Sequence, residues 1–162
     1  MAMKPSSQTS AAPRRTSRGF TLVEAMVVVT IIGLLAALAI PALARSRAAS
    51  RRTAFINDLR IGRDAFEVYA LENGAWPPDG LSAIPDEMNT LLPPARWSQS
   101  TPIGGTWDWD NDQYGFRAGL SVLAPNLTDA EMAIIDAAID DGDLTTGVFQ
   151  QRSGGFISVL EP

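Results

Sequence analysis

Residues 14–24 read RRTSRGFTLVE, and this short stretch decides how the first third of the chain folds. A basic leader without any acidic residue ends at Gly19, and an apolar run, residues 20–44, begins at Phe20. Because a helix rises about 1.5 Å per residue, this run is long enough to cross a hydrocarbon core of about 30 Å. Its single charge is Glu24. A carboxylate within a membrane costs about 2.5–3.5 kcal/mol at the centre and less near an end, so Glu24 indicates a function and a partner.

The junction between Gly19 and Phe20 resembles the processing site of type IV pilins and type II secretion pseudopilins, and the resemblance is specific from Gly19 to about Arg52. It implies that prepilin peptidase cuts after Gly19 and that the new N-terminal Phe20 is N-methylated. Glu24 then becomes the fifth residue of the mature chain. Its carboxylate would be neutralised by the α-amine of a neighbouring subunit's Phe20, so that this pair sets the step between subunits during assembly. Pro41 stands where the family commonly has a proline.

Three other interpretations of the N-terminus remain open at this point. A secretory signal peptide would be cut after Ala44, although the apolar run is longer than the usual signal core of about 7–15 residues and contains Glu24. A twin-arginine signal could begin at Arg14-Arg15, although Ser17 stands where such signals usually place Phe. A plain single-span anchor explains the hydrophobicity but not the sequence around Gly19.

Composition excludes several function classes. The chain has 162 residues and contains neither Cys nor His, and its only lysine is Lys4 in the leader. Histidine-based catalysis, histidine metal sites and disulfides are therefore excluded, and we do not expect an enzyme. The absence of cysteine also favours the pseudopilin branch, because many type IV pilins close a C-terminal loop with a disulfide. Without the four basic residues of the leader, nine basic residues face eighteen acidic ones, which argues against nucleic acid as a partner of the head.

The sequence predicts one long helix from Phe20 to about Asn73. Its first half, residues 20–44, is apolar all round, and its second half, residues 45–74, is amphipathic. One stripe with helical spacing is apolar and should pack on the head, and consists of Phe55, Leu59, Gly62, Phe66 and Tyr69. Pro41 removes a backbone donor and predicts a kink or a melted turn near residues 37–41. Gly74, followed by Pro77-Pro78, should end the helix.

Residues 75–162 are expected to form a globular head on which the long helix packs, giving an α+β, pilin-like fold with a small antiparallel sheet. A short helix is expected at 86–92. A second helix is expected at 128–140, with Thr128 and Glu131 as a capping box. The expected strands are Thr106–Trp109 with a turn at Asp110–Asp112, the returning strand 114–122, and a last hairpin made of 147–152 and 156–160.

Two acidic clusters are candidate calcium ligands, because the resemblance to major pseudopilins implies calcium in the loops of the head. Asp108, Asp110 and Asp112 have the spacing of the start of a calcium loop, but Gln113 and Gly119 replace the Gly and Glu that an EF-hand requires. The second cluster is Asp140, Asp141 and Asp143. The alternative is a solvated hairpin turn and a helix end. Similarly, the alternation of Trp107 and Trp109 places both rings on one sheet face, which favours core over a ligand-binding platform.

Together these features predict a structural subunit of a pilus or pseudopilus, most like the major pseudopilin of a type II secretion system. The expected partners are identical or homologous subunits, prepilin peptidase, the inner-membrane assembly platform and the lipid bilayer. The leader would be cytoplasmic, and the head periplasmic or external. Two alternatives remain: a type IV pilus or DNA-uptake pilin, or a membrane-anchored periplasmic binding module that never polymerises.

Overall fold

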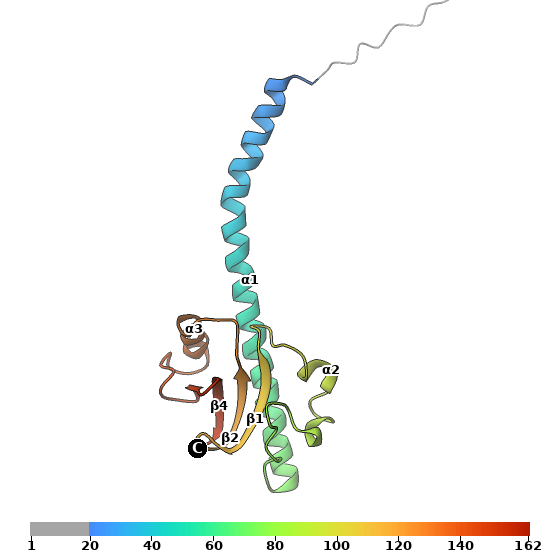
Figure 1. Ribbon diagram of the computed structural model, residues 1–162, viewed down its shortest axis with the longest axis vertical. Helices are drawn as coiled ribbons and strands as arrows, with labels where there is room; N and C mark the ends of the chain where they lie inside the picture. Colours follow the sequence, from blue (N-terminus) through green and yellow to red (C-terminus); the bar gives the residue numbers. More distant parts are fainter. Residues whose placement is uncertain (1–19) are drawn as a thin grey trace, which may run out of the picture. The chain divides into compact units, whose positions relative to one another are not determined.

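The computed structural model describes residues 20–162, so the leader lies outside the described residues. The chain divides into two compact units, with the boundary between Leu43 and Ala44. The first half of helix α1 (Leu22–Asn73) belongs to one unit and its second half to the other. All other elements belong to the second unit, the head, residues 44–162 (Figure 1). In chain order these are η1 (Asp86–Met88), α2 (Pro94–Trp97), β1 (Thr106–Gln113), β2 (Phe116–Leu123), α3 (Asp129–Ile139), β3 (Phe149–Arg152) and β4 (Gly155–Glu161). The predicted α+β class is confirmed.

Helix α1 is assigned as helical without interruption through Pro41. The melted turn that the sequence predicts at residues 37–41 is therefore not present, and the loss of one backbone donor at proline is tolerated within the helix. A kink at Pro41 stays a prediction. The C-terminal end is as expected: Gly74 has a φ of 71°, and its amide donates to the carbonyl oxygen of Ala70 over 2.8 Å. Glycine adopts this left-handed conformation without the steric cost that a Cβ would bring.

The head contains one four-stranded antiparallel sheet in the order β1-β2-β4-β3. The turn predicted at Asp110–Asp112 is wrong, because β1 continues to Gln113, which pairs with Phe116. The turn lies instead at Tyr114 and Gly115, which both have a positive φ, 54° and 86°. Two consecutive residues with positive φ are typical of the tight hairpin turns that match strand twist. The last hairpin is confirmed, and its turn consists of Ser153 and Gly154.

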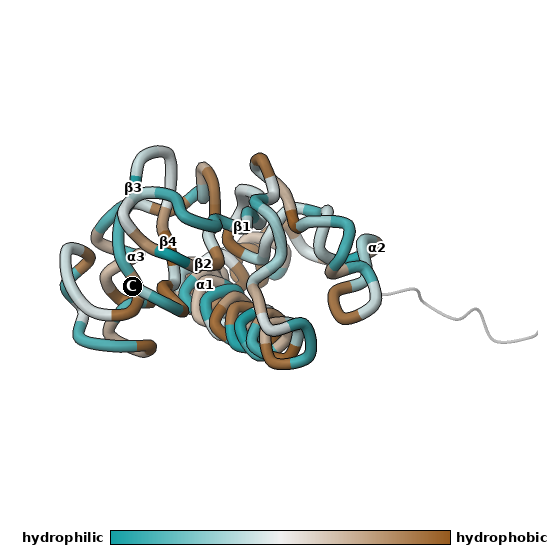
Figure 2. The backbone as a smooth tube through the Cα atoms, turned by 90° about the horizontal axis from the view of Figure 1, so that it is seen from below, coloured by the Kyte–Doolittle hydropathy of each residue, from teal (hydrophilic) through white to brown (hydrophobic). Residues whose placement is uncertain are grey.

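The core of the head forms where the apolar stripe of α1 packs on the sheet. Phe55 stacks on Trp107 with ring centroids 5.2 Å apart, and Phe66 stacks on Trp109 at 3.7 Å. Both tryptophans are buried, so they are core and not a binding platform. Gly62 lies between Phe55 and Phe66 along α1, and a Cβ there would come within 2.5 Å of Leu120 and 3.0 Å of the Trp97 ring. Figures 1 and 2 show the sheet on one side of this part of α1, with α2 beside β1 and α3 beside β3 and β4.

Both outer edges of the sheet receive hydrogen bonds from neighbouring loops. Along β1, the Gly80 amide donates to the Trp109 carbonyl oxygen over 3.1 Å, and the Trp109 amide donates to that of Ala83 over 3.1 Å. Along β3, the Gln151 amide donates to the carbonyl oxygen of Leu144 over 2.7 Å. These bonds occupy edge positions that would otherwise be open to another chain's strand. Of the short helix expected at 86–92, only the 3-10 turn η1 is present, and the four-residue α2 lies beyond that range.

Helix α3 begins as the sequence predicts. Thr128 is the N-cap, its hydroxyl oxygen accepts from the Glu131 amide, and the Glu131 carboxylate accepts from the Thr128 amide over 2.9 Å. Met132 and Ile135 are fully buried on the face that points to the sheet, whereas Ile134 is exposed. The helix thus closes one end of the core and delivers the chain to the acidic loop at residues 140–148.

Candidate functional site

The first turn of α1 places Glu24 in a second capping box. The Thr21 amide and hydroxyl donate to Oε2 of Glu24 over 2.9 and 2.8 Å, and the Glu24 amide donates to the Thr21 hydroxyl over 3.2 Å. A carboxylate in the first turn also interacts favourably with the helix dipole. Among residues 20–162, Oε1 of Glu24 has no hydrogen-bond donor, so half of this carboxylate is open to another molecule. Gly19, the predicted cleavage residue, lies outside the described residues.

The apolar surface that follows is entirely uncovered by the described chain. The large apolar side chains between Phe20 and Leu43 are all exposed, from 46% at Val28 to 77% at Leu22. Helix α1 is long and apolar enough to cross a membrane. The hydroxyl of Thr30 donates to the Met26 carbonyl oxygen over 2.8 Å, so it needs no partner outside the helix. Glu24 is therefore the one side chain in this surface whose polar atoms call for a partner.

Asp108 and Asp110, two of the predicted calcium ligands, lie side by side on the sheet face opposite α1, but they are bound to a cation of the chain. The Arg152 guanidinium is 2.6 Å from Oδ2 of Asp108 and 3.2 Å from Oδ2 of Asp110. Its Nε donates to the Ser121 hydroxyl over 3.0 Å, and that hydroxyl donates to Asp110. Asp112 is exposed and forms none of these ion pairs. This group, the Arg152 cluster, holds its carboxylates on a guanidinium and does not fit a calcium ion.

The Arg152 cluster carries one more negative charge than positive charge, and it is buried. Burial raises the pKa of Asp108 to about 6, helped by the nearby Asp110 carboxylate and opposed by Arg152. Burial likewise raises the pKa of Asp110, opposed by the Ser121 hydrogen bond and Arg152. The ring of Tyr114 covers the guanidinium, whose carbon is 4.4 Å from the ring centroid. The sequence analysis missed Arg152, although two aspartates alternating with buried tryptophans indicate a need for a cation on the opposite face.

The second acidic cluster gains a residue that the sequence analysis missed. Carboxylate oxygens of Asp136, Asp140 and Asp141 all lie within 4.8 Å of one another. Asp136 is fully buried on α3, and neither of its oxygens has a hydrogen-bond partner among residues 20–162. Burial, with the Asp141 and Asp140 charges, raises its pKa. Asp143 instead accepts from the Thr145 amide and hydroxyl. An orphaned buried carboxylate beside two others is a donor set that fits calcium, which takes carboxylate oxygens.

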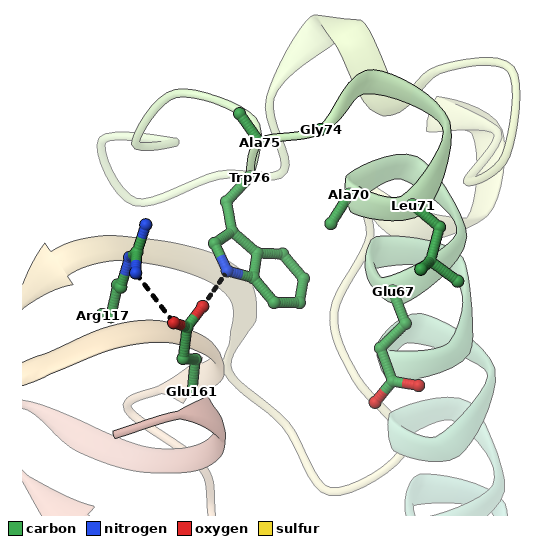
Figure 3. A pocket seen from close by; sticks show the side chains of 8 residues that line it. All are labelled: Glu67, Ala70, Leu71, Gly74, Ala75, Trp76, Arg117 and Glu161. Atoms are coloured by element: carbon green, nitrogen blue, oxygen red, sulfur yellow. Dashed lines mark hydrogen bonds and ion pairs between the residues drawn. The ribbon is translucent and has the colours of Figure 1, made fainter.

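A pocket of about 380 Å³ lies where the chain leaves α1 (Figure 3). The Trp76 indole donates to Oε2 of Glu161 over 2.6 Å, and Arg117 donates to Oε1 over 2.9 Å. Figure 3 shows both side chains pointing at Glu161, while Glu67 on α1 lies apart from them. These bonds join the exit of α1 to β2 and β4, so we assign them a structural role.

Comparison with known proteins agrees with the geometry of the first turn. Residues 14–40 match the model described as the prokaryotic N-terminal methylation motif. The chain is 35% identical over 88 residues to the type II secretion system core protein G of Pseudomonas aeruginosa, which covers 53% of this chain and 62% of that protein. The chain therefore carries the N-terminal methylation motif and is similar, over about half of its length, to type II secretion core proteins G.

Other proteins with secretion-system or pilin names match over a similar extent. The core protein G of Klebsiella michiganensis is 37% identical over 73 residues, 44% of this chain and 51% of the relative. The type IV major pilin protein PilE of Neisseria gonorrhoeae is 39% identical over 66 residues, 41% of this chain and 40% of the relative. The chain thus spans about two fifths to three fifths of the length of these curated relatives. No solved structure matches it significantly.

Proposed function

We propose that this protein is a structural subunit of a helical filament, the pseudopilus of a type II secretion system. Prepilin peptidase would cut the membrane-inserted precursor after Gly19, and Phe20 would be N-methylated. The observation that carries this proposal lies in the first turn of α1. There Oε2 of Glu24 accepts two hydrogen bonds and Oε1 accepts none from residues 20–162, and the apolar surface that follows is not covered by the described chain. The relatives named type II secretion core protein G and type IV pilin support the same conclusion.

Glu24 would act at the step between membrane and filament. In the precursor residue 20 carries a peptide nitrogen, and cleavage after Gly19 would turn it into an α-amine that is cationic at neutral pH. That amine on one subunit can pair with the open Oε1 of Glu24 on the next, while Thr21 holds Oε2. An unpaired carboxylate in a helix bundle is penalised, so only one axial step between neighbours satisfies it. The apolar surface would exchange lipid for other helices. Close packing would therefore supply the cohesion, since the surface is already out of water.

The test combines N-terminal mass spectrometry with an assembly assay in the native host. We expect a wild-type chain that begins at N-methylated Phe20 and forms filaments, and a Glu24→Ala chain that is cut but assembles poorly. Glu131→Ala is the matched control, because it removes the equivalent carboxylate from the capping box of α3 and should leave assembly intact. Normal filaments from Glu24→Ala would contradict the role of Glu24. A chain that keeps its leader, or one that begins at Arg45, would contradict the whole proposal and favour an anchored or secreted binding module.

We also propose that the head binds calcium through Asp136, Asp140 and Asp141. The cation would neutralise the buried Asp136, which has no counterion of its own among the described residues. Because a ligand that binds only the folded state stabilises it, added calcium should raise the melting temperature of the wild-type protein and leave that of Asp136→Asn unchanged. Equal responses of the two proteins would exclude this site.

A further inference from the structure

The second half of α1 is divided into a basic and an acidic segment. Residues 45–63 contain six arginines and a single acidic residue, Asp58. Residues 64–73 contain Asp64, Glu67 and Glu72 and no basic residue. This division runs along one continuous helix, so the two segments are separated mainly along its axis.

Few of these charged side chains form ion pairs within residues 20–162. A negative side chain in the last turn of a helix opposes the helix dipole; this concerns Glu72 and not Asp64 or Glu67, which lie further from the end of α1. Within residues 20–162, neither Asp64 nor Glu67 takes part in an ion pair, and neither do Arg47 and Arg51. All four side chains are exposed. Exposed charges that have no ion-pair partner among the described residues are available to a partner on another chain.

Arg47 and Arg51 point away from the acidic side of the helix, whereas the other four arginines lie within about 60° of the direction of Glu67. At about 100° per residue, Arg47 and Arg51 lie about 40° apart on one flank, and Glu67 lies about 160° round from each of them. Asp64, one turn before Glu67, extends the acidic side. The buried stripe that contacts the sheet separates the basic flank from Glu67. Exposed apolar side chains adjoin the acids, at 39% for Ile61, 41% for Val68 and 85% for Leu71.

We propose that Arg47 and Arg51 of one copy dock against Asp64 and Glu67 of a second copy of this chain, with the two α1 helices parallel. Matching Arg51 and Arg47 to Glu67 requires an axial displacement of 16 to 20 residues, about 24–30 Å at the helical rise. Without displacement, like charges would lie side by side and repel. Because the two surfaces differ, the contact is heterologous, and repetition extends it into an open filament. The inference rests on the proposed function and adds to it a second contact that sets the register, between two copies further apart along the filament than the two joined by Phe20 and Glu24.

Charge reversal in full-length protein tests the pairing. We expect Arg51→Glu and Glu67→Arg each to lower filament yield on the order of tenfold, because each places like charges together, and the double variant to restore it to within about twofold. Glu72→Arg is the matched control, a reversal of an exposed acid in the same segment that lies about 140° round the helix from Glu67. Raising the salt concentration should weaken wild-type filaments, since exposed pairs are screened. Processing at Gly19 and head unfolding, measured in parallel, should be unchanged in all variants.

Several outcomes would overturn the inference without touching the proposed function. Normal filaments from both single variants would do so, as would a double variant no better than either one. If Arg51→Glu weakened membrane retention equally with and without Glu67→Arg, the arginines would bind lipid headgroups instead of a second copy. Wild-type protein that is cut but never forms filaments would overturn the proposed function and the inference together. The cysteine-free chain allows a second measurement: the pair Arg51→Cys and Glu67→Cys should cross-link neighbouring copies into a ladder, whereas Arg60→Cys with Glu67→Cys should not.

Discussion

The two units of this chain differ in whether they bury their apolar side chains and their charged groups. The first half of α1, Leu22–Leu43, buries none of its large apolar side chains and carries one charge, Glu24. The head buries its aromatic core and also buries the side chains of Asp108 and Asp110, which share the one guanidinium of Arg152. The difference teaches that the apolar core of the head is complete by itself, whereas the apolar surface of the first half of α1 needs other molecules to cover it.

The largest expected effect comes from removing the cation on which the head depends. Arg152→Met leaves two buried carboxylates without a counterion, and breaking a buried pair in this way costs about 3–5 kcal/mol of unfolding free energy. Arg117→Met is the matched control, because the Arg117–Glu161 pair is largely exposed and worth no more than about 1 kcal/mol. Denaturant unfolding at pH 8, where the carboxylates are ionised, measures both. Equal costs for the two variants would show that the head does not depend on its buried arginine.

Sequence reasoning predicted the parts of this fold that local signals determine. The length of α1, its buried stripe, its end at Gly74 and the capping box of Thr128 all follow from spacing and from residues a few positions apart. The same holds for the first turn of α1, where Thr21 and Glu24 are three residues apart. These features are encoded within one or two helical turns, so no knowledge of tertiary contacts is needed.

The parts that depend on distant residues could not be predicted in this way. The polar run Asp110–Asp112 has the composition of a turn, yet Asp110 belongs to β1 because Arg152, 42 residues later, neutralises it there. The two-residue turn at Tyr114-Gly115 then follows from the register of the strands. Asp136 is a different case, because Asp140 follows it by four residues, one helical turn, so their proximity could have been predicted from the expected helix at 128–140.

A smaller effect concerns pH and tests how the head holds its excess negative charge. Since the pKa of Asp108 is raised to about 6, the folded protein keeps a proton between about pH 4 and pH 6 that the unfolded chain has lost. Stability should therefore fall as pH rises through this window, by about 2–3 kcal/mol. Asp108→Asn should reduce this slope, leaving the part due to Asp110 and Asp136, whereas Asp112→Asn, exposed and outside the cluster, should keep it whole. A wild-type protein whose stability is flat from pH 4.5 to 7 would contradict the assignment.

The smallest effect compares the two units directly, through their two capping boxes. Thr21 with Glu24 and Thr128 with Glu131 have nearly the same geometry, with amide-to-carboxylate distances of 2.9 Å in both. Thr128→Ala should lower the unfolding free energy of the head by about 1 kcal/mol, the usual cost of losing an N-cap. Thr21→Ala loses the same local bonds but should leave head unfolding unchanged, because it frays a helix end that contributes nothing to the core.

Calorimetry of the two variants in detergent decides whether the units are independent. The structure assigns Thr21 to the unit without a core and Thr128 to the unit with one, so identical chemistry should give unequal costs. A drop in head stability from Thr21→Ala as large as that from Thr128→Ala would mean that α1 transmits order from its first turn to the head. The first half of α1 would then be part of the folded unit and not only a surface for other molecules.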